Sequence, residues 1–191
     1  ALAKAVLSHG HDLVIVSGPV EIQYPDSAKV IPVVSTEEML EVSQEEFAKC
    51  DGLIGVAAPC DYRPVLVSEH KIAKTGQPLV LHLEETPDVV ATLGAGKRAD
   101  QWVVGFALET EDIRFRALAK MERKSCNLMV LNGPEAMNSS ENSVEVMDQG
   151  GRIVSKLAGS KDFVADGIFE IIADRLIAQA AERPHSIDEA D

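Results

Sequence analysis

The sequence predicts an α/β protein with a three-layer, doubly wound and mainly parallel sheet, Rossmann-like in its layout. Short aliphatic runs alternate with amphipathic segments along most of the 191 residues, and this alternation is typical of strand–helix–strand units. The run GLIGVAA at 52–58 lacks the polar alternation of a half-exposed strand, so it fits a buried parallel sheet. A small β-hairpin or lid is expected in the C-terminal third.

Six aliphatic runs are expected to form the strands of the sheet. They are rich in Val, Ile and Leu, and turn-forming or charged residues bound them, which is the usual pattern of a buried strand. The runs lie at 12–18, 29–35, 52–58, 78–83, 102–108 and 127–133. The segments SVEVMD and RIVSKL, on either side of Gly150 and Gly151, predict an additional hairpin.

The first two helices have clear boundaries in the sequence. Apolar residues recur with helical spacing from Leu2 to His9, and Gly10 ends this helix as a C′ glycine. The second helix starts at Thr36, carries acidic residues in its first turn and runs to about Lys49. Its apolar face consists of Met39, Leu40 and Phe47.

Three more helices follow the central strands. The third starts with Thr86 as the N-cap and Pro87 in the first turn. The fourth spans 111–124, and the fifth is capped by Ser160 and has one apolar stripe. Together these elements predict a single domain over residues 1–181, followed by a polar tail at 182–191.

One element of the doubly wound layout is not found in the sequence. Such a fold opens with a strand and a phosphate-facing loop before its first helix, whereas this chain starts with the helix. In the usual strand order that opening strand is central. We therefore expect an unfilled slot in the sheet, and a continuous sheet would contradict this expectation.

The composition excludes several classes of protein. No apolar stretch approaches the ~20 residues of a membrane span, and the first residues lack the pattern of a signal peptide. A net charge of −13 repels nucleic acid and anionic lipid, although a small phosphorylated ligand can bind where cations gather. Cys50, Cys60 and Cys126 are far apart and odd in number, which favours a reducing cytoplasm. The His residues are dispersed, so no metal site is predicted.

The strongest candidate site follows the strand at 52–58. Beyond that strand come an acid, a phenol, a guanidinium and two lysines: Asp61, Tyr62, Arg63, Lys71 and Lys74. Ligands of open α/β sheets bind at the carboxyl ends of the strands. Asp61 can accept hydrogen bonds from a base or ribose, and Lys71 can neutralise a phosphate. The alternative is a solvated loop.

Two other features favour an anion. The helix start at Thr86–Val90 presents free backbone N–H groups, although most such helix starts bind nothing. Arg116, Lys120 and Lys124 share one helical stripe, where like charges repel by roughly 0.2–0.5 kcal/mol per pair unless anions face them. Either neighbouring acidic side chains neutralise this stripe, or phosphate does.

Several other signals have no clear function in the sequence. The polar segment 134–143 is either a lid or a plain connection. The run GAGKR at 94–98 has Ala91 where the Walker spacing needs Gly, and it is expected to end the preceding helix. No GxGxxG occurs, which disfavours a nicotinamide-dependent oxidoreductase. Cys60 is expected to be a small apolar filler rather than a nucleophile, and Trp102 and Phe106 are expected in the core.

Taken together, these segments resemble phosphopantothenoylcysteine synthetase, the C-terminal half of the bifunctional coenzyme A biosynthesis flavoprotein of bacteria. AAPCDYRP is similar to the family's AAVADYRP, KIAK to its KIKK, TPDVV to its NPDIV and VGFALET to its VGFAAET. SKDFVADGIFEII resembles its last helix. The resemblance covers nearly the whole chain, and several ordered motifs are more specific than any one of them.

The resemblance implies a phosphopantothenate–cysteine ligase. In that family CTP, with Mg²⁺, activates the carboxylate of 4′-phosphopantothenate as an acyl-cytidylate, and the amine of cysteine then attacks it. The resemblance also implies a homodimer and a fused flavoprotein decarboxylase half upstream, and no flavin is expected in this chain. No protein nucleophile is needed, because cations and Mg²⁺ absorb the charge that develops on phosphorus.

The resemblance also implies the residues of a nucleotide site. Lys71 would contact the phosphates and act electrostatically as the catalytic residue, while Lys120 and Lys124 would meet the triphosphate. The other implied nucleotide-binding residues are Gly55, Val56, Ala57, Asp61, Pro87, Asp88, Val89, Val90 and Phe106. No residue is assigned to the metal.

The chain departs from the family pattern in three places. Pro59 and Cys60 replace Val and Ala, and Ser140 stands where the lid motif has Asp. The family's glycine-rich loop and its NRSSGKMG segment do not occur in the sequence. A nucleotide-binding module without ligase activity is therefore the alternative, and CTP binding without turnover would favour it.

Overall fold

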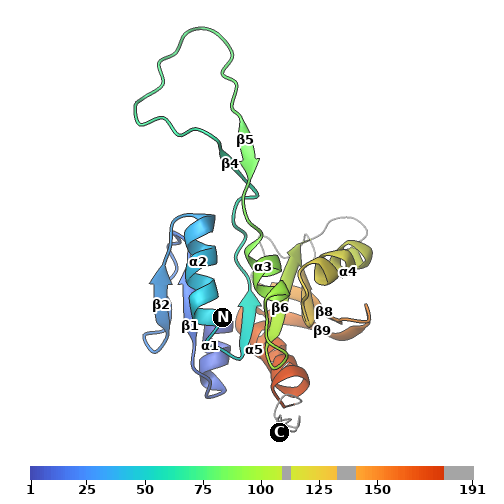
Figure 1. The fold of residues 1–191 in the computed structure, drawn as a ribbon. Helices are drawn as coiled ribbons and strands as arrows, with labels where there is room; N and C mark the ends of the chain where they lie inside the picture. The colour runs from blue at the N-terminus through green and yellow to red at the C-terminus, as the bar shows by residue number, and fades with distance from the viewer. Residues whose placement is uncertain (109–112, 133–140, 179–191) are drawn as a thin grey trace, which may run out of the picture.

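The structure, a computed structural model, describes residues 1–108, 113–132 and 141–178. It consists of two sheets with helices on both faces and a long arm that projects from the carboxyl end of β3 (Gly52–Gly55) (Figure 1). The predicted α/β class and doubly wound layout are confirmed. The arm, by contrast, was not predicted from the sequence.

The main sheet has five strands in the order β3-β6-β7-β8-β9. β6 (Trp102–Leu108) pairs in parallel with β3 and with β7 (Leu128–Asn132). β8 (Glu141–Asp148) and β9 (Ile153–Ser160) continue the sheet as an antiparallel hairpin. This hairpin was predicted, and its turn contains Gly151 with φ +75°, a backbone conformation that glycine adopts without strain.

The second sheet pairs only β1 (Val14–Ser17) with β2 (Lys29–Pro32), in parallel. Among the described strands β1 has no other neighbour, and β3 is paired only with β6. The sheet is therefore interrupted between β1 and β3, as the sequence led us to expect. The consequence is that these two strands each present an edge without a strand partner in the described part of the chain.

Helices cover the two faces of the main sheet, and each face has its own apolar cluster. α1 (Leu2–Ser8) and α5 (Lys161–Ile172) pack on one face, and a π-helical turn at Ala173–Ile177 continues α5. α2 (Thr36–Phe47), α3 (Val89–Ala95) and α4 (Ile113–Arg123) pack on the other. Successive strand residues alternate between the faces. Accordingly, Val104, Val130 and Val144 pack toward α5, whereas Val103, Met129 and Leu131 pack toward α2, α3 and α4.

The helix starts were predicted with one error. α2 begins at Thr36 behind Ser35, which forms a capping box with Glu38. α5 follows its predicted cap, Ser160. The start of α3, however, was placed too early: Asp88 is its N-cap, not Thr86. The Thr86 hydroxyl donates instead to the carbonyl of Cys60, so it is part of the arm's base.

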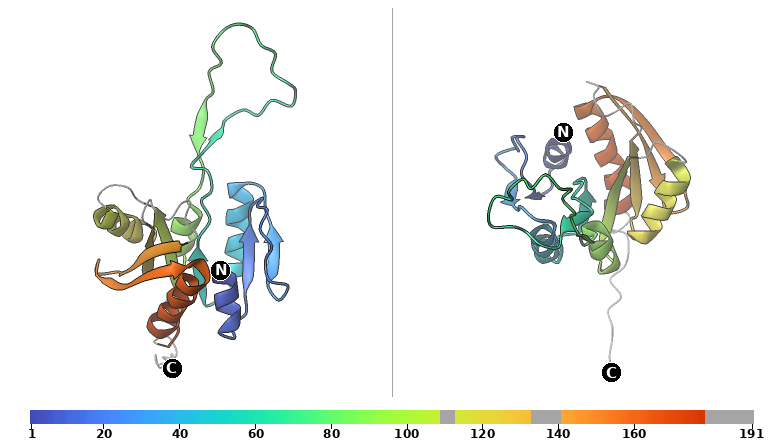
Figure 2. Two further views of the ribbon diagram at one scale, coloured as in Figure 1. Left: turned by 180° about the vertical axis from the view of Figure 1, so that it is seen from behind. Right: turned by 90° about the horizontal axis from the view of Figure 1, so that it is seen from above.

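The arm consists of two short strands and a long loop. β4 (Tyr62–Pro64) pairs antiparallel with β5 (Leu83–Glu85), and residues 65–82 extend beyond them (Figures 1 and 2). The predicted strand at 78–83 is therefore wrong, since only its last residue belongs to a strand. The run is aliphatic but exposed, and no neighbouring strand pairs with its residues 78–82.

Arg63 fixes the base of the arm against the body. Its guanidinium contacts Glu37 of α2 at 2.6 Å and Glu84 of β5 at 2.8 Å. Backbone bonds add to this: Thr86 N donates to the Asp61 carbonyl at 2.9 Å, and Val65 N to the His82 carbonyl at 2.9 Å. A guanidinium suits this position because its planar fork holds two carboxylates at once.

Gly52 is required by its cross-strand neighbour. Trp102 lies opposite it in the parallel ladder, and a Cβ on Gly52 would lie 2.0 Å from Trp102 Cε2. The indole therefore occupies the place of a side chain on β3. We expect Gly52→Ala to lower the free energy of unfolding by about 1–3 kcal/mol through overpacking, measured as a lower urea midpoint.

The matched control is Gly96→Ala at the end of α3. A Cβ there would make only an ordinary contact, 3.6 Å from the Thr92 carbonyl oxygen, so its unfolding free energy should change by no more than about 0.5 kcal/mol. Equal urea midpoints for the two variants would contradict the role given to Gly52.

Candidate functional site

The candidate site lies where β3 and β6 end and α3 begins. The parallel register of β3 and β6 brings their carboxyl ends to one edge of the sheet, and ligands of open α/β sheets bind at such an edge. Gly55, the last residue of β3, lies against the start of α3, because a Cβ on it would be 2.6 Å from Val90 Cγ2. Two of the predicted nucleotide-binding segments are thus in contact.

Asp88 joins the start of α3 to the end of α4. Its carboxylate accepts a hydrogen bond from Ala91 N at 3.1 Å, lies 3.2 Å from Lys124 Nζ and 3.3 Å from an Arg123 nitrogen. Partial burial alone would raise the pKa of Asp88, but the Ala91 hydrogen bond and the Lys124 charge outweigh it, so the pKa is lowered. The carboxylate therefore stays ionised at neutral pH.

The ion pair between Asp88 and Lys124 shows how one residue of the cationic stripe is neutralised. Lys124 is neutralised by an acidic neighbour in this structure, which was one of the two alternatives. Lys120 lies one turn earlier on α4 and is partly buried, while Arg116 is exposed. Ala117 and Met121, which directly follow Arg116 and Lys120, are buried against the sheet, so the stripe runs beside the buried side of α4.

Val56, Ala57 and Asp61 lie on the segment that connects β3 to β4 of the arm. All three are exposed. The Asp61 carbonyl accepts the hydrogen bond from Thr86 N, which places Asp61 next to the segment that leads through Pro87 into α3. The structure therefore brings the predicted residues at 55–61 and 87–90 together at the arm's base.

Phe106 lies on the other face of the sheet. It is partly buried and packs against the apolar cluster under α1 and α5, opposite Val130 in the β6–β7 register. Its prediction as a core residue is confirmed, as is that of Trp102. The predicted contact of Phe106 with a nucleotide stays a prediction.

Lys71 is not brought to this site within one chain. It belongs to the exposed loop 65–82 at the outer end of the arm, whereas α4 packs on the body (Figures 1 and 2). The contact of Lys71 with the phosphates that the resemblance implies therefore stays a prediction. Lys74 is on the same loop.

Two asparagines near this edge were missed by sequence reasoning. The Oδ1 atoms of Asn132, at the end of β7, and Asn142, near the start of β8, are buried and have no hydrogen-bond partner among the described residues. The available signal was a polar residue that ends an aliphatic run, but burial of its oxygen cannot be read from a sequence.

Three other predictions have mixed outcomes. Cys60 is exposed and not a core filler, whereas Cys126 is buried, and burial raises the pKa of its thiol to about 11. The predicted GAGKR helix end is confirmed, since α3 ends at Ala95. Residues 134–140 of the possible lid lie outside the described part, while 141–143 belong to β8 rather than to a loop.

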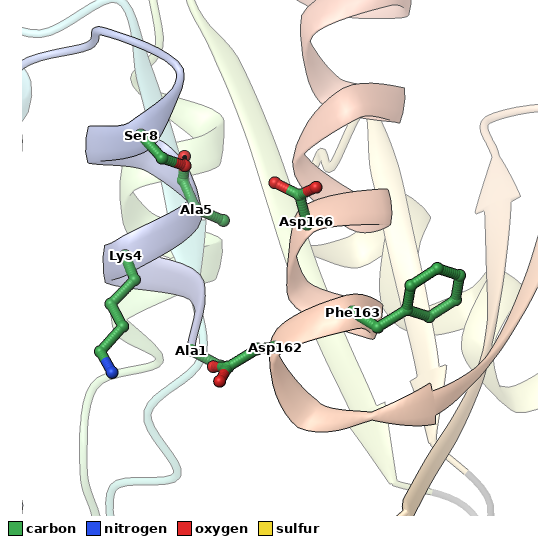
Figure 3. Close-up of a pocket in the computed structure, with 7 residues that line it drawn as sticks. All are labelled: Ala1, Lys4, Ala5, Ser8, Asp162, Phe163 and Asp166. Atoms are coloured by element: carbon green, nitrogen blue, oxygen red, sulfur yellow. Dashed lines mark hydrogen bonds between the residues drawn. The ribbon is translucent and has the colours of Figure 1, made fainter.

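A surface pocket of about 350 Å³ lies away from these residues, between α1 and α5. Figure 3 shows Asp162 and Asp166 of α5 facing α1, and Asp166 pairs with His9 at 2.9 Å. Its lining consists of Ala1, Lys4, Ala5, Ser8, Asp162, Phe163 and Asp166. Two carboxylates make it a poor phosphate site, and it contains none of the predicted residues.

No helix in the described ranges has the length and apolar character needed to cross a membrane. Within the same ranges no three His, Cys, Asp or Glu side chains are grouped so that they could hold a metal ion.

Known proteins resemble this chain along most of its length. The Coenzyme A biosynthesis bifunctional protein CoaBC of Haemophilus influenzae is 33% identical over 175 residues, which is 90% of this chain and 44% of that protein. A cysteine/cysteine sulfinic acid decarboxylase of an unknown prokaryotic organism is 41% identical over 134 residues, 69% of this chain and 37% of that protein. The chain thus spans less than half the length of these curated relatives.

Solved structures show the same fold. The crystal structure of the C-terminal domain of CoaBC matches with a TM-score of 0.77 at 29% identity, over 93% of this chain and 81% of the other. A Cab2 variant in complex with phosphopantothenate-cysteine matches with a TM-score of 0.73 at 14% identity, over 94% and 78%. The family description "DNA/pantothenate metabolism flavoprotein C-terminal domain" matches residues 1–176. The chain belongs to this family, as a CoaB-type C-terminal domain.

Proposed function

We propose that this chain is the ligase domain that joins 4′-phosphopantothenate to cysteine at the expense of CTP. The observation that carries the proposal is the meeting, at one sheet edge, of segments that the resemblance assigns to the nucleotide: Gly55 against Val90, and Asp88 against Lys124. Family membership and the names of the relatives support the same reaction. The alternative is a module that binds the nucleotide but does not catalyse ligation. The assays below distinguish it from the ligase.

The reaction needs a leaving group on the carboxylate. A carboxylate oxygen of phosphopantothenate attacks the α-phosphorus of CTP and pyrophosphate leaves, which gives the acyl-cytidylate. The amine of cysteine then attacks the acyl carbon, loses a proton, and CMP leaves as the amide bond forms. Both steps develop negative charge on phosphate oxygens, so the chain's contribution is positioning and positive charge.

Lys120 and Lys124 supply that charge in the proposal. Asp88 holds the ammonium of Lys124 beside the end of β3 until the triphosphate arrives, and the lysine then exchanges part of its contact with the carboxylate for phosphate oxygens. Mg²⁺ is commonly held through substrate phosphates and water with few protein ligands, so cations at the edge fit a magnesium nucleotide. When bound, the ion shields the phosphate charge.

We propose a homodimer formed through the arm. The loop 65–82 exposes seven large aliphatic side chains: Val65, Leu66, Val67, Ile72, Leu79, Val80 and Leu81, each 50–87% exposed. Exposed apolar groups gathered on one segment mark an interface, and a second copy offers an identical arm for a two-fold contact. Lys71, which is remote from its own α4, would then serve the nucleotide of the partner.

We also propose the setting of the reaction. We expect a flavoprotein decarboxylase half upstream, as in the bifunctional relatives. We place the reaction in the cytoplasm, where the three free cysteines stay reduced.

The cationic stripe is tested by Lys120→Gln and Lys124→Gln. Each change removes one positive charge facing the phosphates, so we expect CTP affinity to fall about tenfold or more per lysine, or about 1.4 kcal/mol, by calorimetry at fixed salt. The control is Lys29→Gln, which removes a lysine paired with Glu46 on the distant β2. A similar loss in the control would contradict the assignment.

Lys71→Gln is expected to abolish ligation while urea unfolding stays unchanged, because the residue is exposed on the arm loop. Turnover is measured as CMP release and phosphopantothenoylcysteine formation. Since Lys71 serves the partner's site, a mixed dimer of Lys71→Gln and Lys124→Gln subunits keeps one site with both lysines and one site with neither. Its turnover should therefore be about half that of the wild-type dimer. If wild type binds CTP without turnover, the module interpretation holds instead.

The dimer is tested by Leu66→Asp together with Val80→Asp. Charges on the arm oppose burial between two copies, so sedimentation should show a shift from dimer to monomer. Val34→Asp is the control, since Val34 is equally exposed, at 82%, but lies outside the arm. An unchanged dimer in the double variant would show that the contact lies elsewhere.

A further inference from the structure

One side chain of the arm is paired with a helix of the body. The guanidinium of Arg63, the middle residue of β4, lies 2.8 Å from Glu84 of β5 and 2.6 Å from Glu37 of α2. The contact with Glu84 is made within the arm's own ladder. The contact with Glu37 is different, because α2 packs in the apolar cluster of the main sheet, so this ion pair connects the arm to the body.

Glu37 is a well-held partner for Arg63. It is the second residue of α2, in a turn that a capping box fixes: the Ser35 hydroxyl accepts from Glu38 N at 3.1 Å, and the Glu38 carboxylate accepts from Val34 N at 2.7 Å. Glu37 Oε1, the atom that Arg63 contacts, is shielded from solvent. A buried carboxylate oxygen is costly without a positive partner, so the pair favours one direction of the arm.

Other bonds at the root of the arm connect its two strands to each other. The Thr86 N–H donates to the Asp61 carbonyl at 2.9 Å, and the Thr86 hydroxyl donates to the Cys60 carbonyl. These bonds close the arm as a hairpin that leaves the body beside α2 (Figures 1 and 2). A closed hairpin can still swing about its root. The pair of Arg63 and Glu37 opposes that swing, because it lies beyond the root and reaches the body.

The length of the arm makes its direction important. Lys71 comes eight positions after Arg63, which corresponds to as much as about 26 Å of extended chain. A turn of about 20° at the base moves a group at that distance by about 9 Å. A displacement of about 1 Å from the productive geometry can cost on the order of a hundredfold in rate. The contact at the base therefore controls whether the ammonium group reaches a phosphate.

We propose that Arg63 is a positioning residue for ligation: through Glu37 it sets the direction of the arm and so brings Lys71 to the nucleotide held by the other subunit. This inference rests on the proposed ligase function and on the proposed homodimer. The side chains of Arg63 and Glu37 are 49% and 38% exposed, and ion pairs so exposed contribute little to folding stability. Loss of the pair should therefore lower turnover rather than stability.

The test compares Glu37→Gln with Glu41→Gln in the full-length gene product. Both changes remove one negative charge from α2, but Glu41 is exposed and one turn further along the helix. We expect Glu37→Gln to lower kcat about tenfold or more, with the KM for cysteine and the urea midpoint unchanged. Glu41→Gln should match wild type. Adding Glu37→Gln to Arg63→Gln should cost nothing further, because the same contact cannot be lost twice.

A mixed dimer shows in which subunit the pair acts. One subunit carries Glu37→Gln together with Lys71→Gln, and the other is wild type. If Glu37 serves only its own arm, both changes disable the same arm, and the wild-type arm still serves one site. Turnover should then be about half that of the wild-type dimer, as in a mixed dimer with Lys71→Gln alone. If Glu37 acted on the site of its own subunit, each site would be damaged and turnover would nearly vanish.

Three results overturn the inference. They are wild-type kcat in Glu37→Gln, a nearly inactive mixed dimer, and a lowered urea midpoint that explains the loss of turnover. Sedimentation of Glu37→Gln should still show a dimer, because the aliphatic side chains of loop 65–82 are unchanged. A monomer would mean that the pair serves assembly instead, and this result also contradicts the proposed positioning role.

The outcome is separable from failure of the proposed function. If wild type shows no turnover, the ligase proposal fails, and the direction of the arm still decides the inference. Nitroxide labels at Thr75→Cys in the arm loop and Gln44→Cys on α2, in a Cys60→Ala background diluted with unlabelled protein, report the arm-to-body distance by electron–electron double resonance. A distribution that broadens or shifts in Glu37→Gln but not in Glu41→Gln supports the inference. Equal distributions in all three proteins overturn it.

Discussion

The ion pair between Asp88 and Lys124 is the contact on which the site's geometry depends. The Asp88 carboxylate caps α3 and pairs with Lys124 after α4, while Val90, in the first turn of α3, packs against Gly55 at the end of β3. The start of α3 therefore joins three segments that are separated in sequence. Because the pair is only partly buried, its contribution to stability is modest. Its importance is positional, since it keeps an ammonium group at the sheet edge without a bound anion.

The body and the arm of the molecule obey different constraints. In the body, alternate strand residues fill two apolar clusters, and the strand ends are left for polar groups. In the arm, only a short ladder and the Arg63 contacts with Glu37 and Glu84 hold the chain. Aliphatic side chains beyond that ladder are exposed within one subunit. The fold therefore combines a body with two buried apolar clusters and an arm whose aliphatic side chains are exposed.

Much of this architecture was predictable because the relevant signals are local. The strand at 102–108 was found with its observed bounds, and α2 and α5 were found from their caps and apolar stripes. The arm was missed because aliphatic residues at 78–83 resemble a buried strand, and burial is decided by neighbours that sequence patterns do not name. The N-cap of α3 was shifted because Thr86 and Asp88 are both good caps.

The candidate site was predictable to the extent that it lies on strand ends and helix starts. Gly55, Asp61, Asp88 and Val90 were expected together and are close in the structure. Lys71 and Lys120 were both assigned to the phosphates, but the position of Lys71 depends on an arm that no periodicity indicated. Asn132 and Asn142 were missed because an unsatisfied oxygen is a property of packing, not of spacing.

The three cysteines differ in chemical reactivity as a consequence of where the fold places them. Thiolates, not thiols, react with electrophiles; burial holds the pKa of Cys126 at about 11, and burial followed by the charges of Glu46 and Asp51 raises that of Cys50. Cys60 alone is exposed, at the root of the arm. A maleimide fluorophore would therefore attach first at Cys60. Its fluorescence would report movement of the arm without any introduced cysteine.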